Sequence, residues 1–352
     1  MENVMNLTLK IYKHIDSNLE LKIEKFLIEN STLNNLNPLF SSPLWALRLK
    51  KMLSFKFEYL LVSQDKEMVG LSLIFQGYRG YSRITKLPNF LKTSISKTLM
   101  VCFPYISWGN PIIVKNDVDS NIARECKKMI YDYITKKQKT VSFSPILETE
   151  IEYFDGYPMG KWGTYIIDFK HRTYEELYRK IRRQGRKSIE KALEKGVVVK
   201  TLNIEDEEEL NKYIRFLKDN QRVTGKKYII KKENILEEYK RFKKNSYIYE
   251  IFLAYYNNSI HGSLGIWGFN NFITEHGVNY TQFSKENKLY VQDAIKNSII
   301  KYCIDNGIHY YDLAGFNPSS EATQKEKNIK RFKEKFGGEK FLYYIVNGKR
   351  SK

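Results

Sequence analysis

The segment NIKRFKEKFGGEKFLYY, residues 328–344, contains the residue types best suited to chemistry in this sequence. Phe332 and Phe336 are four residues apart and therefore share one face of a predicted helix, whereas Lys333 and Lys335 point in different directions. The glycine pair that follows predicts a left-handed turn that ends this helix. Two interpretations stay open: a solvated amphipathic helix that buries its phenylalanines, or the cationic edge of a site that handles phosphates or a developing oxyanion.

A second group of candidates lies at the ends of predicted strands. Asp312 follows two tyrosines in HYYDLAGF, where a carboxylate can orient a group, accept a proton or hold a neighbouring amide. Tyr280 and Tyr105 are strand-end aromatic residues beside expected clefts. Because no serine or cysteine lies in a nucleophile motif, a direct, non-covalent transfer fits the sequence better than a covalent intermediate.

The formal net charge of the 352-residue chain is +19, and it is concentrated in two segments. Residues 170–200 carry eleven Lys or Arg against four Glu, and residues 325–352 carry ten against three, so each segment contributes +7. A concentrated positive field attracts polyanions such as nucleic acid, an anionic membrane face or a phosphorylated substrate. The charge therefore predicts a polyanionic partner without identifying it.

The composition disfavours several classes of protein. No stretch approaches the roughly 18 uninterrupted apolar residues of a membrane span, and the first residues lack the pattern of a signal peptide, so we expect a cytoplasmic protein. The three cysteines are far apart and odd in number, which indicates neither a disulfide framework nor a metal site. Cys102 and Cys303 lie in apolar patterns and are expected in the core. The five histidines show no metal-ligand spacing, so neither a metal nor a cofactor is predicted.

Strand and helix patterns recur in a similar order in both halves of the chain: a strand, a helical pair, antiparallel strands, a helix and a strand. Residues 146–163, rich in Gly, Pro and aromatics, are expected to separate a first domain, 1–150, from a second, 151–352. Mixed α/β domains, each with a central and mostly antiparallel sheet flanked by helices, are the natural architecture for this order.

Two local predictions concern the surroundings of the candidate residues. LMVCFPYI, residues 99–106, is predicted to be a buried strand. A single long helix is predicted from about Thr173 to Lys195, with an apolar stripe that steps by four and includes Gly185. Glycine inside a helix costs about 1 kcal/mol relative to alanine, so we expect a neighbouring backbone to approach Gly185 closely.

Four segments together resemble the Fem-type peptidyltransferases, which are built from two tandem acetyltransferase-like (GNAT-type) domains. FSSPLWALRLKK (40–51) is similar to an early Ser-Ser-x-x-Trp helix of that family, and RKIRRQGRKSIEKALEKGVVV (179–199) is similar to its basic helix entering the second domain. GIHYYDLAGF (307–316) resembles its Gly-x-x-x-Tyr-Asp strand, and RFKEKFGGE (331–339) resembles its Phe-Lys-x-x-Phe-Gly-Gly ending. The segments follow the family's order and span nearly the whole chain.

The resemblance implies an α/β (α+β) chain of two tandem GNAT-like domains that acts as an acyltransferase. Members of the family move an amino acid from aminoacyl-tRNA to an amino group on a cell-wall precursor peptide. This implies aminoacyl-tRNA and a UDP- or lipid-linked cell-envelope precursor as partners of this chain. By the same resemblance Lys333 stabilises charge during transfer, and Phe332 and Arg331 border the site.

The resemblance also implies binding residues elsewhere in the chain. YISWGNP (105–111) resembles a first-domain turn toward the acceptor pocket, which favours Tyr105 and Trp108 as lining residues. Arg48 lies near the family's cation for precursor phosphates, and Arg222 and Lys226 belong to a second cationic cluster at a helix-to-loop junction. Peripheral association with the cytoplasmic membrane face is compatible with these cations.

The prediction of the acyl donor rests on the absence of a glycine-rich phosphate-binding loop. GNAT enzymes that use acetyl-CoA usually hold its pyrophosphate in a glycine-rich loop before a helix, where bare backbone amides face the phosphates. The corresponding residues 282–290, QFSKENKLY, contain no glycine, which favours aminoacyl-tRNA as the donor. Two alternatives stay open: an acetyl-CoA or other acyl-thioester-dependent N-acyltransferase of cell-surface polysaccharide biosynthesis, and a non-catalytic nucleic-acid-binding protein on a GNAT scaffold.

Overall fold

The computed structural model describes residues 6–32, 36–53, 55–78, 95, 98–224, 230–244 and 246–351. The chain forms two compact units: unit 1 contains residues 1–163 and 342–352, and unit 2 contains residues 164–341. The division falls at the end of the expected boundary segment 146–163. Residues 151–163 and 342–352, which were expected in the second domain, therefore belong to unit 1.

Unit 1 is built on a sheet with the strand order β1-β2-β3-β4-β6-β13, to which β5 is added beside β3. The neighbouring pairs are antiparallel except β4 with β6, which is parallel. The elements are β1 (Leu7–Tyr12), α1 (Ser17–Asn30), η2 (Pro38–Ser41), α2 (Pro43–Leu53), β2 (Lys56–Gln64), β3 (Glu67–Tyr78), β4 (Pro104–Trp108), β5 (Ile113–Val114), α5 (Ser120–Lys137), β6 (Thr140–Ile146), η3 (Glu148–Phe154) and the later part of β13 (Glu339–Lys349).

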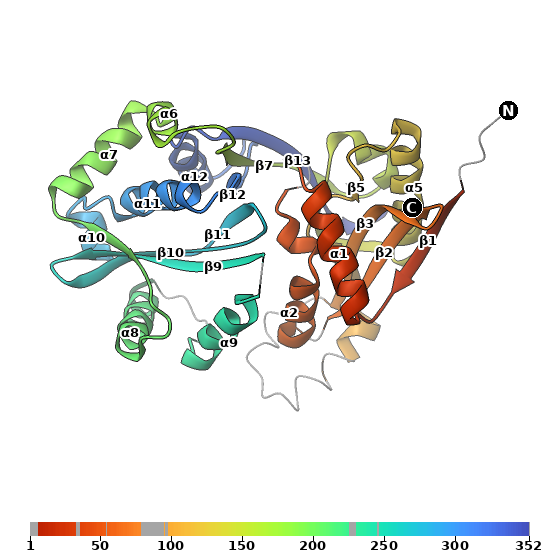
Figure 1. The fold of residues 1–352 in the computed structure, drawn as a ribbon, viewed down its shortest axis with the longest axis horizontal. Helices are drawn as coiled ribbons and strands as arrows, with labels where there is room; N and C mark the ends of the chain where they lie inside the picture. Colours follow the sequence, from red (N-terminus) through yellow and green to blue (C-terminus); the bar gives the residue numbers. More distant parts are fainter. Residues whose placement is uncertain are drawn as a thin grey trace. The chain divides into compact units, whose positions relative to one another are not determined.

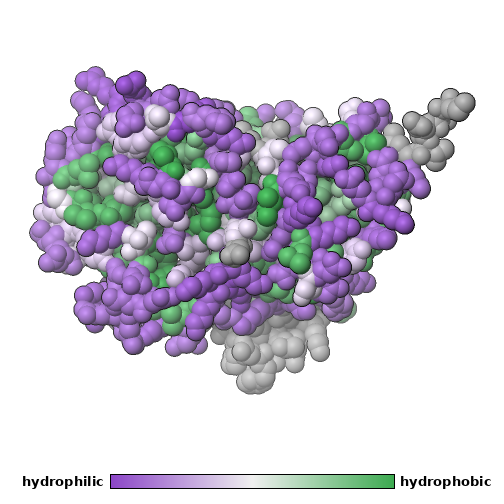
Figure 2. All heavy atoms as spheres, viewed as in Figure 1, coloured by the Kyte–Doolittle hydropathy of each residue, from purple (hydrophilic) through white to green (hydrophobic). Residues whose placement is uncertain are grey.

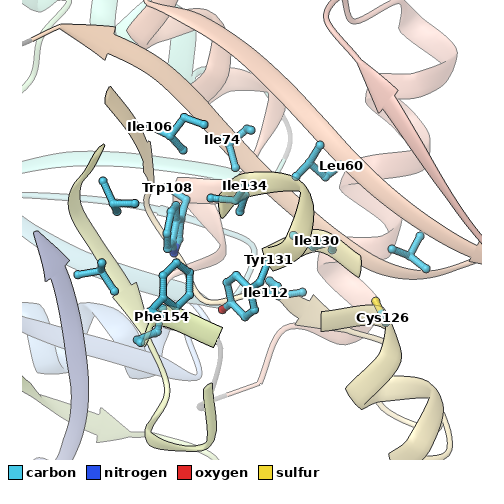
Figure 3. Packing of buried hydrophobic residues seen from close by; sticks show 14 of the residues in the cluster. Leu60, Ile74, Ile106, Trp108, Ile112, Cys126, Ile130, Tyr131, Ile134 and Phe154 are labelled. Carbon is cyan, nitrogen blue, oxygen red and sulfur yellow. The ribbon is translucent and has the colours of Figure 1, made fainter. Parts of the chain in front are cut away.

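The core of unit 1 packs around helix α5. Cys126 and Ile130 are four residues apart on the helix face that is removed from solvent, and both are fully buried. Figure 3 shows Trp108 and Phe154 close together in this packing, with their ring centroids 5.5 Å apart. Aromatic side chains contribute much of the apolar area that such a core removes from water.

Unit 2 has a sheet with the strand order β7-β12-β11-β10-β9-β8. The strands from β8 to β11 are antiparallel neighbours, and β11 runs parallel to β12. The strands are β7 (Met159–Asp168), which enters from unit 1, β8 (Val198–Thr201), β9 (Tyr247–Tyr256), β10 (Ser259–Phe269), β11 (Phe272–Tyr280) and β12 (Tyr310–Phe316). The predicted α/β class, with a mostly antiparallel sheet in each half, is confirmed.

Helices cover both faces of the sheet in unit 2 (Figure 1). Helix α11 packs on β9, β10 and α7, whereas α8 packs on β10 and β11 and α9 packs on β9. Leu210 and Leu217 of α8 meet Ile251 and Leu253 of β9 in the core of that second face. The helices are α6 (Tyr174–Lys180), α7 (Arg183–Glu194), α8 (Glu207–Thr224), α9 (Lys232–Phe242), α10 (Gln282–Glu286), α11 (Val291–Asp305) and α12 (Gln324–Glu334).

The prediction of one helix from Thr173 to Lys195 is wrong, because the chain breaks between α6 and α7. Ile181 has extended backbone angles, and the amide of Arg182 donates to the carbonyl of Lys335 at 2.8 Å. This tertiary hydrogen bond replaces the helical one. The expected close approach at Gly185 is present, since a Cβ there would lie 3.4 Å from the same Lys335 carbonyl.

The prediction of a buried strand over residues 99–106 is wrong in its first half. Residues 98–102 are helical, and β4 begins only at Pro104. Val101 is 80% exposed and Cys102 is also exposed, so Cys102 is not a core residue. Cys303 is fully buried, as predicted. An apolar run without period-two alternation does not distinguish a strand from a short helix.

Candidate active site

Helix α12 carries the cationic segment and is held firmly at both ends. At its start, Thr323 and Glu326 form a capping box in which each side chain accepts a hydrogen bond from the other residue's amide. At its end, Gly337 adopts φ +75°, as the glycine pair predicted. A Cβ at Gly337 would lie 2.7 Å from the carbonyl oxygen of Lys180, so a larger residue does not fit. The helix is therefore fixed against the break between α6 and α7.

Phe332 of α12 and Phe336, just beyond the end of the helix, place their rings beside cations. The Phe332 and Phe336 rings are 5.4 Å apart in an edge-to-face arrangement, and Phe336 is 2% exposed. Lys335 places its ammonium 4.2 Å from the centre of the Phe332 ring and forms an ion pair with the buried Asp293 of α11. Lys335 does point away from the contact made by Lys333, as expected, but into the interior of unit 2 rather than into solvent.

Lys333 has a different kind of partner from the other buried lysines. Its ammonium donates to the carbonyl oxygen of Gly315 in β12 at 2.8 Å, and no carboxylate among the described residues forms an ion pair with it. Burial lowers the pKa of Lys333 to about 8, while the carboxylates of Glu275 and Asp312 oppose this effect and the ammonium of Lys296 adds to it. A largely buried cation thus has only a neutral acceptor in contact.

Asp312 lies at the bend of β12 beside this contact. Its carboxylate accepts a hydrogen bond from the amide of Ala314 at 2.7 Å and another from the hydroxyl of Thr164. Burial raises the pKa of Asp312 to about 6, against the lowering effects of these two hydrogen bonds and of the Lys333 ammonium. Ala314 has φ +64°, a left-handed conformation that costs an alanine about 1 kcal/mol. The carboxylate therefore holds the neighbouring amide, one of the roles considered from the sequence.

A second buried ion pair near Lys333 was not predicted. Lys296 of α11 and Glu275 of β11 form this pair with side chains only 2% and 5% exposed, and the Tyr311 hydroxyl donates to the same Glu275 oxygen at 2.6 Å. The Lys296 ammonium lies 5.6 Å and 5.5 Å from the ring centres of Phe332 and Phe336. The available signal was a lysine within the apolar helix sequence DAIKNSII, where a charge needs a buried partner.

The other unit 2 candidates are more exposed. Tyr280 ends β11 and is 47% exposed. Arg331 lies in the last turn of α12 with an exposed side chain. Phe332 is partly buried, with its ring near the ammonium groups of Lys296 and Lys335. The structure therefore brings Lys333, Asp312 and Phe332 into one neighbourhood, with Arg331 on the outer face of the same helix.

Three candidates belong to unit 1. Trp108 is 2% exposed, and its indole nitrogen donates to the carbonyl of Pro145 at 2.8 Å, so it is a core residue rather than a pocket residue. Tyr105 is 5% exposed and lines a hollow of about 450 Å³ together with Lys56 and Lys137. The guanidinium of Arg48 lies 4.8 Å from the Trp45 ring centre. The resemblance favoured Trp108 as a lining residue, but Figure 3 shows it packed in the core beside Phe154.

The cationic cluster at the end of α8 is only partly described. The backbone of Arg222 belongs to α8, whose last residue is Thr224. The side chain of Arg222 and the whole of Lys226 lie outside the described residues.

A row of basic side chains follows one edge of α7. Arg183, Lys187 and Lys191 recur every four residues, are exposed, and line a hollow of about 510 Å³ with Tyr290. In the described part of the chain these three cations form no ion pair, whereas the nearby Arg182 pairs with Glu334 at 2.8 Å. Figure 2 shows mostly hydrophilic surface where α6 and α7 lie. Like charges at this spacing repel one another, so a bound polyanion would relieve an existing repulsion.

The amino terminus of α11 differs from a phosphate cradle. The preceding residues form the short helix α10, and Tyr290 enters α11 with φ +51°. The amide of Asp293 donates to the carbonyl of Tyr290 at 2.9 Å, and the Asp293 carboxylate occupies the first turn. An acidic group at this position competes with a phosphate for the positive end of the helix.

The described residues form neither a metal-ligand cluster nor a membrane-spanning helix. Among the described residues, no three His, Cys, Asp or Glu side chains gather as metal ligands would. Within the same residues, no helix combines the length and the apolar character needed to cross a bilayer.

Comparisons with known proteins find similarity in fold alone. No protein-family model matches the sequence, and no curated protein matches it. The chain is similar to the crystal structure of FemX, with a TM-score of 0.60 and 12% identity over 96% of this chain and 97% of that one. It is also similar to the C-terminal domain of a protein named as a lysylphosphatidylglycerol synthetase from Agrobacterium fabrum (TM-score 0.55, 9% identity, 94% of this chain and 92% of that one). A tandem GNAT protein from the clavulanic acid biosynthesis pathway matches with a TM-score of 0.53 and 8% identity, over 99% of this chain and 100% of that chain.

These similarities cover both units and nearly the full length of each compared chain. They confirm that the chain has the tandem GNAT-like fold shared with FemX, which the resemblance implied. Identities this low establish the fold and leave the reaction to be argued from the residues of the site.

Proposed function

We propose that this chain is an acyltransferase that moves an aminoacyl group from aminoacyl-tRNA to an amino group of a cell-envelope precursor peptide. The observation that carries the proposal is the environment of Lys333. Lys296 and Lys335, which lie over the Phe332 and Phe336 rings, are each neutralised by a carboxylate. Within the described part of the chain, the Lys333 ammonium donates to the carbonyl of Gly315 and pairs with no carboxylate. A buried ammonium without a counter-ion is well suited to receive negative charge that appears during a reaction.

The chemistry assigned to this ammonium is stabilisation of an oxyanion. The amine of the acceptor attacks the ester carbonyl of the donor, a C–N bond forms, and the carbonyl electron pair moves onto oxygen. Lys333 binds that oxygen. The intermediate then breaks its C–O bond, and the proton lost by the amine ends on the departing tRNA hydroxyl. The atoms balance without any additional reactant.

Asp312 and the bend of β12 support this role. The carboxylate holds the amide of Ala314, and this fixes the neighbouring Gly315 carbonyl against Lys333. Its negative charge also favours the protonated state of Lys333. Phe332 and Arg331 are assigned to the border of the substrate site, on the buried and exposed faces of α12, and Tyr280 to an exposed position at the end of β11.

The donor and the acceptor are assigned to different surfaces. The row Arg183, Lys187 and Lys191 suits the phosphates of tRNA, and the closed turn before α11 disfavours CoA. In the hollow lined by Tyr105, Lys56 and Lys137, the last residue is paired with Glu58, so Lys56 is the cation assigned to the phosphate of a UDP- or lipid-linked acceptor. Charged tRNA is a cytoplasmic molecule, so the reaction is assigned to the cytoplasm, with the lipid-linked acceptor at the membrane face.

The test is an incubation of the purified chain with tRNA charged with labelled amino acids, together with UDP-linked and lipid-linked precursors. Transfer of label to the precursor amine, lost when the tRNA is deacylated beforehand, is the expected result. Parallel reactions contain labelled acetyl-CoA instead of charged tRNA. Acetylation of the precursor or of an amino sugar would favour the acyl-thioester alternative. Nucleic-acid binding without transfer from either donor would favour a non-catalytic protein.

A further inference from the structure

The buried ion pair between Lys296 and Glu275 lies close to Lys333 but has no role in the reaction described above. Both side chains are almost completely removed from solvent, and burying two charges is costly even when they are paired. Apolar residues of similar volume would fill the same space without that cost. The position of the pair, rather than its contribution to stability, therefore needs an explanation.

The geometry relates the pair directly to the helix that carries Lys333. The Lys296 ammonium faces the rings of Phe332 and Phe336, which flank Lys333 in the sequence of α12. Glu275 is held in place by the Tyr311 hydroxyl at 2.6 Å, and Tyr311 is the neighbour of Asp312 in β12. The pair thus connects α11 and β11 with the two elements that position Lys333.

We propose that Lys296 and Glu275 are positioning residues that set the charge state of Lys333, with the two members of the pair acting in opposite directions. This inference rests on the proposed function of Lys333 as a cation in the site. The Glu275 carboxylate attracts the Lys333 ammonium, whereas the Lys296 ammonium repels it. Both act through the protein interior, where charges are poorly screened.

The pKa of Lys333 depends on all the charged and titratable groups around it. From β12, Asp312 favours the ammonium form of Lys333 and Tyr311 orients Glu275. From α11, Lys296 disfavours that form, and Asp293 is already paired with Lys335 of α12. The balance gives Lys333 a pKa of about 8. Removing one member of the Lys296–Glu275 pair should move that pKa in a direction fixed by the sign of the lost charge.

The experiment measures the protonation of Lys333 without any substrate. Trace labelling with acetic anhydride reacts only with neutral amines, and peptide mass spectrometry follows Lys333 alone as the pH is varied. For Lys296→Met, the loss of a repelling charge should raise the labelling midpoint by about one pH unit. For Glu275→Gln, the loss of an attracting charge should lower it by a similar amount. The double variant should restore a midpoint near that of the wild type, and Lys296→Arg should leave it unchanged.

Unit 1 provides a matched control. Glu150 there is fully buried, pairs with Lys127 at 2.8 Å and accepts the Tyr131 hydroxyl at 2.6 Å, so it offers a similar lysine–glutamate–tyrosine arrangement away from Lys333, with a lysine that is 21% exposed. Lys127→Met also leaves a buried glutamate without its cation and should leave the Lys333 midpoint where it was. This separates an effect on charge from a general loss of stability.

The outcomes separate this inference from the proposed function, because labelling needs neither tRNA nor precursor. Opposed shifts in the two single variants support the inference even if no transfer is detected. Shifts in the same direction, or midpoints that stay unchanged, overturn it even if the chain is an active transferase. If a single variant unfolds, the labelling is repeated with trimethylamine N-oxide, which favours compact states. If neither single variant folds under those conditions, the pair is purely structural and the inference fails.

Discussion

Substitution of Lys333 by methionine should abolish most turnover while leaving the fold at least as stable as before. Methionine keeps much of the length and apolar volume of the lysine stem but removes the charge. Loss of one donor to an oxyanion typically slows catalysis by about 100- to 1000-fold. Burying the same ammonium also costs folding free energy, so its removal should lower activity without a matching loss of stability.

The size of that burden follows from the pKa. Burial lowers the pKa of Lys333 from 10.5 to about 8, and each pKa unit corresponds to about 1.4 kcal/mol. At pH 7 the buried ammonium therefore opposes folding by roughly 3 kcal/mol. The hydrogen bond to the Gly315 carbonyl, lost on substitution, contributes about 1.5–3 kcal/mol because its donor is charged. The two terms nearly cancel, and the melting temperature at pH 7 should stay constant or rise slightly.

The assay compares initial rates of aminoacyl transfer and thermal unfolding at pH 7 for Lys333→Met and for Lys327→Met. Lys327 is an exposed residue of the same helix, so its substitution removes an equal charge from the surface and should change neither quantity appreciably. Lys335 is unsuitable as this control, because its pair with Asp293 is buried. The reasoning is refuted if Lys333→Met lowers the melting temperature by several degrees, or if both variants lose similar, small fractions of the activity.

Four further results are expected. Transfer should show a bell-shaped pH dependence, with a rise near pH 6 as Asp312 ionises and a fall near pH 8 as Lys333 loses its proton; a flat profile from pH 5 to 9 would contradict it. Because burial raises the pKa of Asp312, its protonated carboxyl group stabilises the fold below about pH 4, and this contribution is lost as the pH rises through 6. In denaturant titrations, the free energy of unfolding of Asp312→Asn should therefore rise relative to that of the wild type between about pH 4 and pH 6. The affinity for tRNA should fall steeply as the salt concentration rises, and the slope of log affinity against log salt should be smaller when Arg183 and Lys187 are both replaced by glutamine. Calorimetry should detect no micromolar binding of CoA. A tRNA affinity that does not depend on salt, or tight binding of CoA, would reassign the donor.

The sequence predicted the local features of the site, because they depend on neighbouring residues. The four-residue spacing of Phe332 and Phe336 predicts their shared face, and the glycine pair predicts the left-handed turn at Gly337. The antiparallel strands expected in each half are likewise present in unit 2 as β9, β10 and β11. In each case the information lies within about ten residues of the feature.

The features that escaped prediction depend on contacts between distant segments. The break at Ile181 exists because the amide of Arg182 bonds to the Lys335 carbonyl, a residue more than 150 positions away. Propensity and periodicity favour a continuous helix there, and the tertiary hydrogen bond overrides them. Trp108 was assigned to a pocket from the resemblance of YISWGNP to a family turn, and such a motif does not show whether an aromatic ring faces a cleft or a core.

The buried lysines Lys296, Lys333 and Lys335 illustrate the same limit most clearly. Sequence alone separates Lys333 from Lys335 by direction, but it cannot tell which buried ammonium has a carboxylate beside it, because Asp293 and Glu275 come from other elements. Only in the folded chain does Lys333 differ from its neighbours: its partner is a neutral carbonyl, presented by a bend that contains a left-handed alanine. The unpaired charge of Lys333 and the left-handed backbone of Ala314 both weaken the fold. They lie on either side of the hydrogen bond from Lys333 to the carbonyl of Gly315. A negative charge that arrives only during a reaction would complete the environment of Lys333, which is why its substitution should separate activity from stability.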